Sequence, residues 1–302
     1  MASGDILGRI ASQETSEEIL EKITEVNTNV VEITGDMTLI NSTIGTDNPV
    51  PLDTMLTQLL YGTVFEYSTP GTYQLLIPAN VNKIKVTACG GGGGGAYPKE
   101  LGGAGGGGGG AAISNTEYTV TPQSTINITV GSGGAAGSYD NPTGSDGNAT
   151  VISDMVTLAG GKGGQNTTIP SSSSYSGSGG VAGGSGGGNG GMGWSSPYPD
   201  RTNYTAQSGE DGIIGTGGSG GQTGTTNQNT SRASVAGGGG GGSIGNGGNG
   251  GGSGTATGNV RNGIRGGGGG GGSYINSSGS GAKTAGGSGG SGYVKIELLI
   301  TP

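Results

Sequence analysis

The chain contains no histidine and a single cysteine, Cys89, among its 302 residues. Without histidine, neither a Ser-His-Asp nor a Cys-His catalytic arrangement can be assembled from this chain, and imidazole metal sites are excluded. A lone cysteine excludes an internal disulfide framework and any cysteine-cluster metal site. We therefore expect no enzyme activity, no cofactor and no bound metal ion.

Large apolar side chains are also scarce, at 29% hydrophobic and 4% aromatic residues. No run approaches the roughly 18 consecutive apolar residues of a membrane span. The first residues, MASGDILGRI, lack the cationic and apolar blocks of a secretory signal. We therefore expect neither membrane insertion nor a signal peptide.

The net charge of −8 is concentrated at one end of the chain. Residues 1–50 hold 9 of the 20 acidic and 2 of the 12 basic residues, which leaves 11 acids against 10 bases in the rest. A nearly neutral body offers no electrostatic footprint for nucleic acid, so we expect no nucleic-acid partner.

Glycine is abundant, with 78 residues beside 11 prolines and no collagen-like period. On composition alone, such a chain is typical of disorder. The distribution is uneven, because residues 1–88 hold 6 glycines and residues 89–302 hold the other 72. Glycine is therefore concentrated in one part of the chain.

Four pure glycine runs of six or seven residues stand out: Gly90–Gly95, Gly105–Gly110, Gly237–Gly242 and Gly266–Gly272. A polyproline-II helix has three residues per turn and no internal hydrogen bonds, so its buried amides and carbonyls need partners on neighbouring chains. A chain in the middle of such a bundle must be all glycine, whereas an edge chain needs glycine on its inward face. The mixed stretches 177–193, 215–224 and 245–254 fit edge chains. A flexible surface loop is the competing interpretation.

The N-terminal part carries a different pattern. Thr15 and Glu18 fit a helix capping box. Eight apolar residues then alternate at spacings of four and three: Ile19, Ile23, Val26, Val30, Ile33, Met37, Ile40 and Ile44. This heptad seam predicts a self-associating coiled coil, and aliphatic β-branched residues at both seam positions favour three or four strands, a trimer first. Threonine and asparagine between the seam positions are poor helix formers, which leaves a fibrous β arrangement or a short fraying coil as alternatives.

We divide the chain into three parts on these patterns. Residues 1–46 are expected to form an attachment segment and coiled-coil stalk, and residues 47–62 a linker with a short collar helix. From residue 63 the apolar period changes to two, which predicts strands near 64–67, 73–77, 83–88, 118–120, 126–130, 151–158 and 294–300. Because strands lie at both ends of the glycine-rich middle, we expect a mainly β fold. It would be an antiparallel β-sandwich with an inserted polyglycine-II helix bundle, preceded by the stalk.

Recognition of a partner must come from the non-glycine loops, since bare glycine has no side chains to offer. The richest loop spans 194–204, where the candidate binding residues are Trp194, Tyr198, Asp200, Arg201 and Tyr204. Secondary candidates are Tyr97, Tyr139, Tyr175 and Tyr274. Aromatic rings stack on the apolar faces of sugars and give large contact area at low entropy cost. The alternative is that these residues form a small local core that caps the bundle.

Several segments carry a family resemblance. The stretch YSTPGTYQLLIPANVNKIKVTACGGGGGGAY (67–97) resembles the opening of glycine-rich domains in bacteriophage tail fibre and receptor-binding proteins. Later landmarks, at 116–137, 156–164 and 286–298, follow in the order expected for that family. The pattern is also similar to extracellular glycine-rich domains of some animal receptors.

The resemblance implies a polyglycine-II β-sandwich at a fibre tip that contacts a host-surface glycan or protein. It also implies a virion protein assembled in the host cytoplasm and attached through its N-terminus to a tail or baseplate protein. Two alternatives stay open: a purely structural fibre or appendage subunit, and an ice-binding protein with flat, regular faces.

Overall fold

The computed structural model describes residues 63–98, 103–166, 175–196, 206–219, 234–238, 240–251, 262–275 and 282–299. These residues form thirteen β-strands and no α-helix. Within the same ranges, no helix is long and apolar enough to cross a membrane. The predicted stalk and collar, with the seam residues from Ile19 to Ile44, lie outside the described residues.

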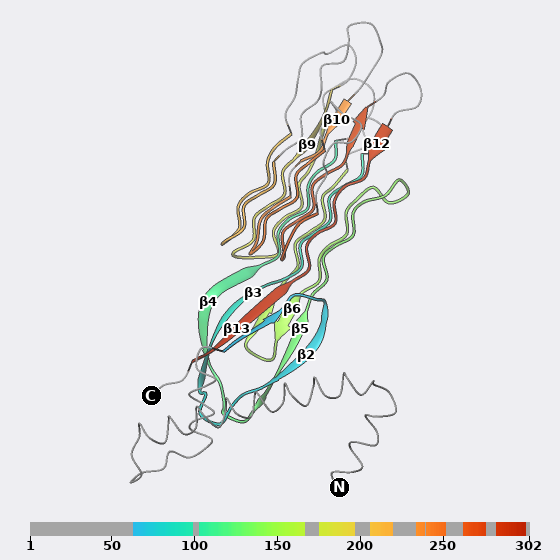
Figure 1. The fold of residues 1–302 in the computed structure, drawn as a ribbon. Helices are drawn as coiled ribbons and strands as arrows, with labels where there is room; N and C mark the ends of the chain where they lie inside the picture. Colours follow the sequence, from blue (N-terminus) through green and yellow to red (C-terminus); the bar gives the residue numbers. More distant parts are fainter. Residues whose placement is uncertain are drawn as a thin grey trace, which may run out of the picture. The chain divides into compact units, whose positions relative to one another are not determined.

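Two four-stranded antiparallel sheets form the apolar half of the described chain (Figure 1). The first sheet has the order β1-β13-β3-β4 and contains β1 (Val64–Tyr67), β13 (Tyr293–Leu299), β3 (Lys83–Cys89) and β4 (Ala112–Thr119). The second has the order β2-β5-β6-β7 and contains β2 (Gly71–Leu76), β5 (Thr125–Val130), β6 (Thr150–Ile152) and β7 (Val156–Leu158). The first and last strands are neighbours, as expected from strands at both ends of the sequence.

Both sheets contribute to one hydrophobic core. In β3, Ile84, Val86 and Ala88 are fully buried, and Ile126, Ile128 and Val130 of β5 belong to the same cluster. The opposite face of the first sheet carries ion pairs, with Lys83 near Glu117 and Lys85 near Glu297. The period-two prediction is therefore confirmed in these strands, because alternate side chains point to opposite sides of a sheet. The boundaries differ most at β4, which begins at Ala112, six residues before the predicted start, and at β2, which begins at Gly71, two residues before it.

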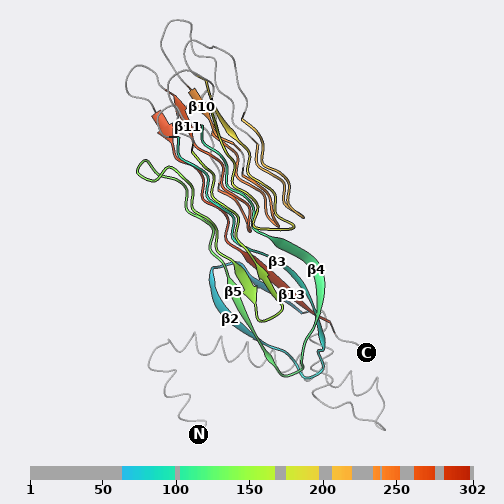
Figure 2. The same cartoon turned by 180° about the vertical axis from the view of Figure 1, so that it is seen from behind.

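Six strands of the two sheets continue directly into glycine-rich segments (Figures 1 and 2). β3, β5 and β7 are followed by segments 90–96, 131–137 and 159–165, and β4, β6 and β13 are preceded by 105–111, 142–148 and 286–292. Each segment therefore starts from a fixed position in a sheet.

Backbone hydrogen bonds join these segments side by side. Successive amides of Gly90–Gly95 donate in turn to segments 105–111, 142–148 and 287–290, and the pattern repeats every third residue at N–O distances of 2.8–2.9 Å. Its carbonyls, with that of Ala96, accept from a second set of three segments: 134–137, 161–164 and 269–272. The first glycine run is thus hydrogen-bonded to six surrounding segments.

We call the fourteen hydrogen-bonded segments the array. Four of them are interior: 90–96, 105–111, 266–272 and the described residues of 237–242, each bonded to five or six others. Ten outer segments form a closed ring around them, and each bonds to the next: 131–137, 142–148, 159–165, 178–183, 185–191, 207–213, 214–219, 245–251, 262–265 and 286–292. The four interior segments contain the four pure glycine runs, as expected for chains in the middle of a bundle.

A small second cluster lies where the array meets the first sheet. It contains Cys89, Ala112, Ile244 and Tyr293, all buried. The Sγ of Cys89 donates to the carbonyl of Arg265 at 3.2 Å, and the guanidinium carbon of Arg265 lies 4.5 Å from the centre of the Tyr293 ring. These contacts bind the turn at 264–266 to the sheet.

A third sheet lies at the other end of the array, and the sequence patterns do not predict it. Its order is β12-β11-β10-β9-β8, with all pairs antiparallel. Its strands are β8 (Tyr175–Gly177), β9 (Gly193–Ser196), β10 (Ser234–Ala236), β11 (Ser273–Ile275) and β12 (Ala282–Thr284). Three or four residues are too few to display a periodic pattern.

Candidate functional site

The candidate site is the end of the array that carries the third sheet, far from the two core sheets (Figure 1). We call this end the tip and define it as β8–β12 together with residues 97–98, 137–142 and 166. Five of the nine predicted binding residues lie here: Tyr97, Tyr139, Tyr175, Trp194 and Tyr274. The other four, Tyr198, Asp200, Arg201 and Tyr204, lie outside the described residues.

Tyr97 and Tyr139 contact each other at the tip although they come from different segments. Their ring centres are 6.3 Å apart and the planes stand at 85°, an edge-to-face arrangement that is typical of favourable aromatic pairs. Tyr139 is 59% exposed, whereas Tyr97 is partly buried. Burial and the neighbouring Tyr139 raise the pKa of the Tyr97 hydroxyl above its ordinary value. The Tyr97 phenol therefore stays neutral at physiological pH.

Lys283 completes this group from β12. Its ammonium nitrogen lies 5.2 Å from the Tyr139 ring centre and 6.0 Å from the Tyr97 ring centre. Both distances fall within the range of cation–π attraction. The three side chains thus form one cluster, which we call the tyrosine–lysine cluster.

The array fixes the backbone under this cluster. The amide of Tyr97 donates to the carbonyl of Pro142 at 2.7 Å, and the Nδ2 of Asn166 donates to the carbonyl of Tyr97 at 2.9 Å. Beside Tyr139, the amide of Ser138 donates to the carbonyl of Asn141, whose own amide donates to the Ser138 hydroxyl. Hydrogen bonds therefore hold the backbone of Tyr97 on both sides and close the turn that carries Tyr139.

The register of the third sheet relates the remaining candidates. Tyr175, Ser195, Val235, Tyr274 and Lys283 are successive partners across the five strands and form one row. Trp194 belongs to the next row, paired with Ser176 and Ala236. Tyr175 and Tyr274 therefore share a row of paired residues with Lys283, and Trp194 does not.

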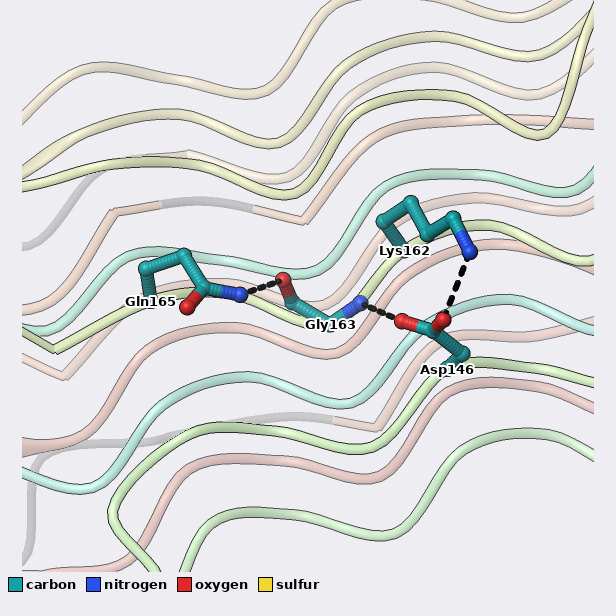
Figure 3. Close-up of polar contacts among 4 residues, drawn as sticks. All are labelled: Asp146, Lys162, Gly163 and Gln165. Carbon is teal, nitrogen blue, oxygen red and sulfur yellow. Dashed lines mark hydrogen bonds and ion pairs between the residues drawn. The ribbon is translucent and has the colours of Figure 1, made fainter.

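A polar group on the flank of the array has a different character (Figure 3). The ammonium of Lys162 lies 2.7 Å from Asp146 Oδ2, and the amide of Gly163 donates to Asp146 Oδ1 at 2.9 Å. These donors hold the pKa of Asp146 below its ordinary value, with the hydrogen bond from Lys162 as the main cause. Both oxygens of Asp146 are therefore engaged within the array. Among the residues that the structure describes, no group of three or more His, Cys, Asp or Glu side chains is placed to hold a metal ion.

A family model described as a glycine-rich domain matches residues 68–299. The chain belongs to this family. The match covers the array, the tip and all strands except β1. No curated protein matches the chain.

Sequence reasoning identified Tyr97 and Tyr139 separately and missed Lys283. Lys283 is 144 residues from Tyr139 and sits in a three-residue strand. The signal that could have identified Lys283 is a hairpin between segments 271–275 and 282–286, because the residues between them, NSSGSG, favour a turn.

Proposed function

We propose that this chain is the tip of a bacteriophage tail fibre, a receptor-binding adhesin that recognises a host cell-surface structure. In this proposal residues 63–302 form a β-sandwich that carries a polyglycine-II helix bundle. The bundle acts as a rigid arm, and the loops at its far end make the contact. The alternative is a structural fibre subunit without receptor specificity.

The concentration of large side chains at the tip carries this proposal. The interior of the array is glycine apart from Ala96 and Ala111, so it has no polar or aromatic side chain with which to recognise a ligand. The tip, by contrast, gathers tyrosines from segments that are far apart in the sequence, with an exposed ring at Tyr139. Exposed aromatic residues on a rigid support are typical of binding surfaces, because little conformational entropy is lost when they bind. A purely structural arm has no need for such a group.

The remaining parts of the proposal follow from the sequence. The heptad seam from Ile19 to Ile44 supports a homotrimer, and its position before the glycine-rich part suits a stalk. Attachment of the N-terminal part to a tail or baseplate protein, and assembly into a virion in the host cytoplasm, follow from the family resemblance. The proposal assigns no catalysis, cofactor, nucleic acid or membrane insertion to the chain.

A binding assay tests the proposal directly. The full chain, fused to a fluorescent protein, is applied to a panel of bacterial strains, and a version with the tip residues Tyr97, Tyr139, Tyr175, Trp194 and Tyr274 replaced by serine serves as the control. The adhesin proposal expects saturable binding to a subset of strains and its loss in the control. Equal binding of both versions, or binding to no strain, would favour the structural alternative.

A further inference from the structure

We propose that the tyrosine–lysine cluster is a carbohydrate subsite, which takes one or two pyranose rings of a host-surface glycan. This inference rests on the proposed function and names the class of ligand at the same end of the molecule. It selects a sugar over a protein surface as the receptor feature that the cluster contacts.

The chemistry of the three side chains fits a sugar. The C–H groups on one face of a pyranose ring pack on an aromatic ring, and the exposed fraction of Tyr139, 59%, leaves ring surface for this contact. The two phenol hydroxyls can donate to or accept from sugar hydroxyls, and the Lys283 ammonium can donate to hydroxyl or ring oxygens. Hydrogen bonds from a charged donor are stronger than neutral ones. Stacking surface and polar donors therefore lie within the width of a single sugar ring.

The surroundings argue against a protein partner at this place. A stable protein interface buries about 800 Å² on each partner and has a core of large apolar and aromatic side chains. The described array segments that lead to the two tyrosines carry mostly glycine, alanine and serine, for example Ala135 and Ser138 on the segment that leads to Tyr139. Such residues cannot fill the pockets that bind protein hot spots. A compact aromatic group on a surface of small side chains suits a sugar ring better.

Hydrogen bonds also hold the residues of the tyrosine–lysine cluster in place. Fixing rotatable side chains and loops on binding has an entropic cost, and a site that is ordered beforehand avoids much of it. Tyr97 is tied on both sides by backbone bonds to Pro142 and Asn166. Lys283 lies in β12 beside Thr284, whose hydroxyl accepts from the Ser273 amide at 3.0 Å and lies 2.7 Å from the Ser273 hydroxyl, to which it is also hydrogen-bonded. The cluster is therefore positioned before any ligand arrives.

The test uses the full chain and a printed array of bacterial lipopolysaccharide and capsular polysaccharide fragments. Each fragment that binds is then titrated by calorimetry against four variants. Tyr139→Ala removes the stacking ring, Lys283→Met removes the ammonium and keeps the chain length, and Tyr139→Phe keeps the ring. Leu76→Ala, at a similarly exposed position on β2 (66%), is the matched control.

We expect Tyr139→Ala and Lys283→Met each to weaken glycan binding by about tenfold or more, because each removes one of the two contact types. Tyr139→Phe should stay within about threefold of the parent and Leu76→Ala should be unchanged. The melting temperature of every variant should stay within about 4 °C of the parent, since the changed side chains are exposed or lie at the tip.

Two outcomes would overturn the inference and leave the adhesin proposal intact. In the first, cells are bound but the Tyr139 and Lys283 variants bind them as the parent does. In the second, the chain binds a purified outer-membrane protein that carries no sugar, and binds no glycan. Binding to no cell and to no glycan would overturn both proposals.

Discussion

At the residue scale, the interior glycines are required because other backbone lies where a side chain would have to be. A Cβ added to Gly94 would meet the carbonyl of Ala135, and one added to Gly91 would meet the carbonyl of Ser132, each closer than the 3.0 Å that real Cβ atoms respect. Glycine is the residue that loses most backbone entropy on ordering. Close approach of the segments offsets this cost, because it lets interior amides such as those of Gly90–Gly95 donate to neighbouring carbonyls.

The first prediction concerns the methyl group that this packing excludes. Gly94→Ala should destabilise the folded chain by about 1–3 kcal/mol or more, because the array must move apart to admit the methyl group. Ala135→Ser adds one atom to an exposed position on the adjoining outer segment and should change stability by less than about 0.5 kcal/mol. Urea unfolding followed by tyrosine fluorescence measures both. Equal stability of the two variants would contradict close packing around Gly94.

At the scale of the element, the outer segments of the array differ from the interior ones in how their backbone amides find hydrogen-bond acceptors. Some of their amides face away from the array and have no backbone carbonyl opposite. Carboxylate and amide side chains on neighbouring outer segments accept from them. The donor and acceptor pairs are Gly163 with Asp146, Thr216 with Asn246, Ser219 with Asn249, Gly217 with Asp211, Ser288 with Asn262, and Ala182 with Asn189.

The spacing of these acceptors follows the period of three. Asn246 and Asn249 are three residues apart, and so are their partners Thr216 and Ser219, both at 3.0 Å. This gives the asparagine and aspartate residues a structural role. A patterned use of asparagine within glycine-rich sequence therefore indicates the outer face of an ordered array.

The second prediction distinguishes the ion pair of Asp146 with Lys162 from its hydrogen bond with the Gly163 amide. Asp146→Asn keeps an oxygen for the Gly163 amide and removes the ion pair with Lys162, so it should cost only a few tenths of a kcal/mol at this half-exposed position. Asp146→Ala removes both and should cost about 1 kcal/mol. Chemical denaturation at pH 7 measures the difference. Identical losses of stability in the two variants would mean that the hydrogen bond from the Gly163 amide does not contribute.

The pH dependence of Asp146 provides a second readout of the same prediction. Because its pKa is lowered in the folded chain, the carboxylate stabilises the fold fully above its ordinary pKa of 3.8, and this contribution is lost as the pH falls through the lowered value. The parent should therefore lose stability more steeply than Asp146→Asn below about pH 4. Parallel curves for the two proteins would contradict the lowered pKa.

The elements differ in how far the sequence could predict them. The core strands were predictable because alternating residues such as Ile84, Val86 and Ala88 sit in a sheet with one buried face. The pure runs were predictable as interior chains because bare glycine suits no other crowded position. The third sheet was not, because its strands are held by pairing across the array and not by local preference. The tyrosine–lysine cluster was missed in part for the same reason, since Lys283 joins it through long-range register.

At the scale of the whole molecule, the array and the core sheets are continuous. Six strands enter the array without a break, and Cys89 ends β3 where the first glycine run begins. Cys89 is fully buried in the cluster with Ala112, Ile244 and Tyr293. Local opening of the array without loss of the sheet would have to break this junction. We therefore expect the array and the sheets to unfold together.

Cys89 provides the chemical probe for the last prediction. Burial raises the pKa of its thiol from 9.0 to about 11, and the thiolate is the reactive form. In the folded chain at pH 8, alkylation by iodoacetamide should therefore be negligible. Its rate should rise with denaturant along the same curve as hydrogen exchange at the amides of Gly93 and Gly94 and at Ile128 in the core.

The sign of the pH effect follows from the same raised pKa. Below pH 9 the Cys89 thiol is neutral in both the folded and the unfolded chain, so its ionisation does not affect stability. Between about pH 9 and 11 the thiol ionises in the unfolded chain but not in the folded one, so the free energy of unfolding should fall as the pH rises. Cys89→Ser, which does not titrate in this window, should show a smaller fall than the parent. A flexible glycine region would behave differently. Its amides, including Gly240–Gly242 and Gly266–Gly269, would exchange at the rate of an unfolded chain while Ile128 stayed protected. Coincident transitions at the thiol, the glycine runs and the core would establish the array as part of one cooperative fold, which is the property that a rigid recognition arm requires.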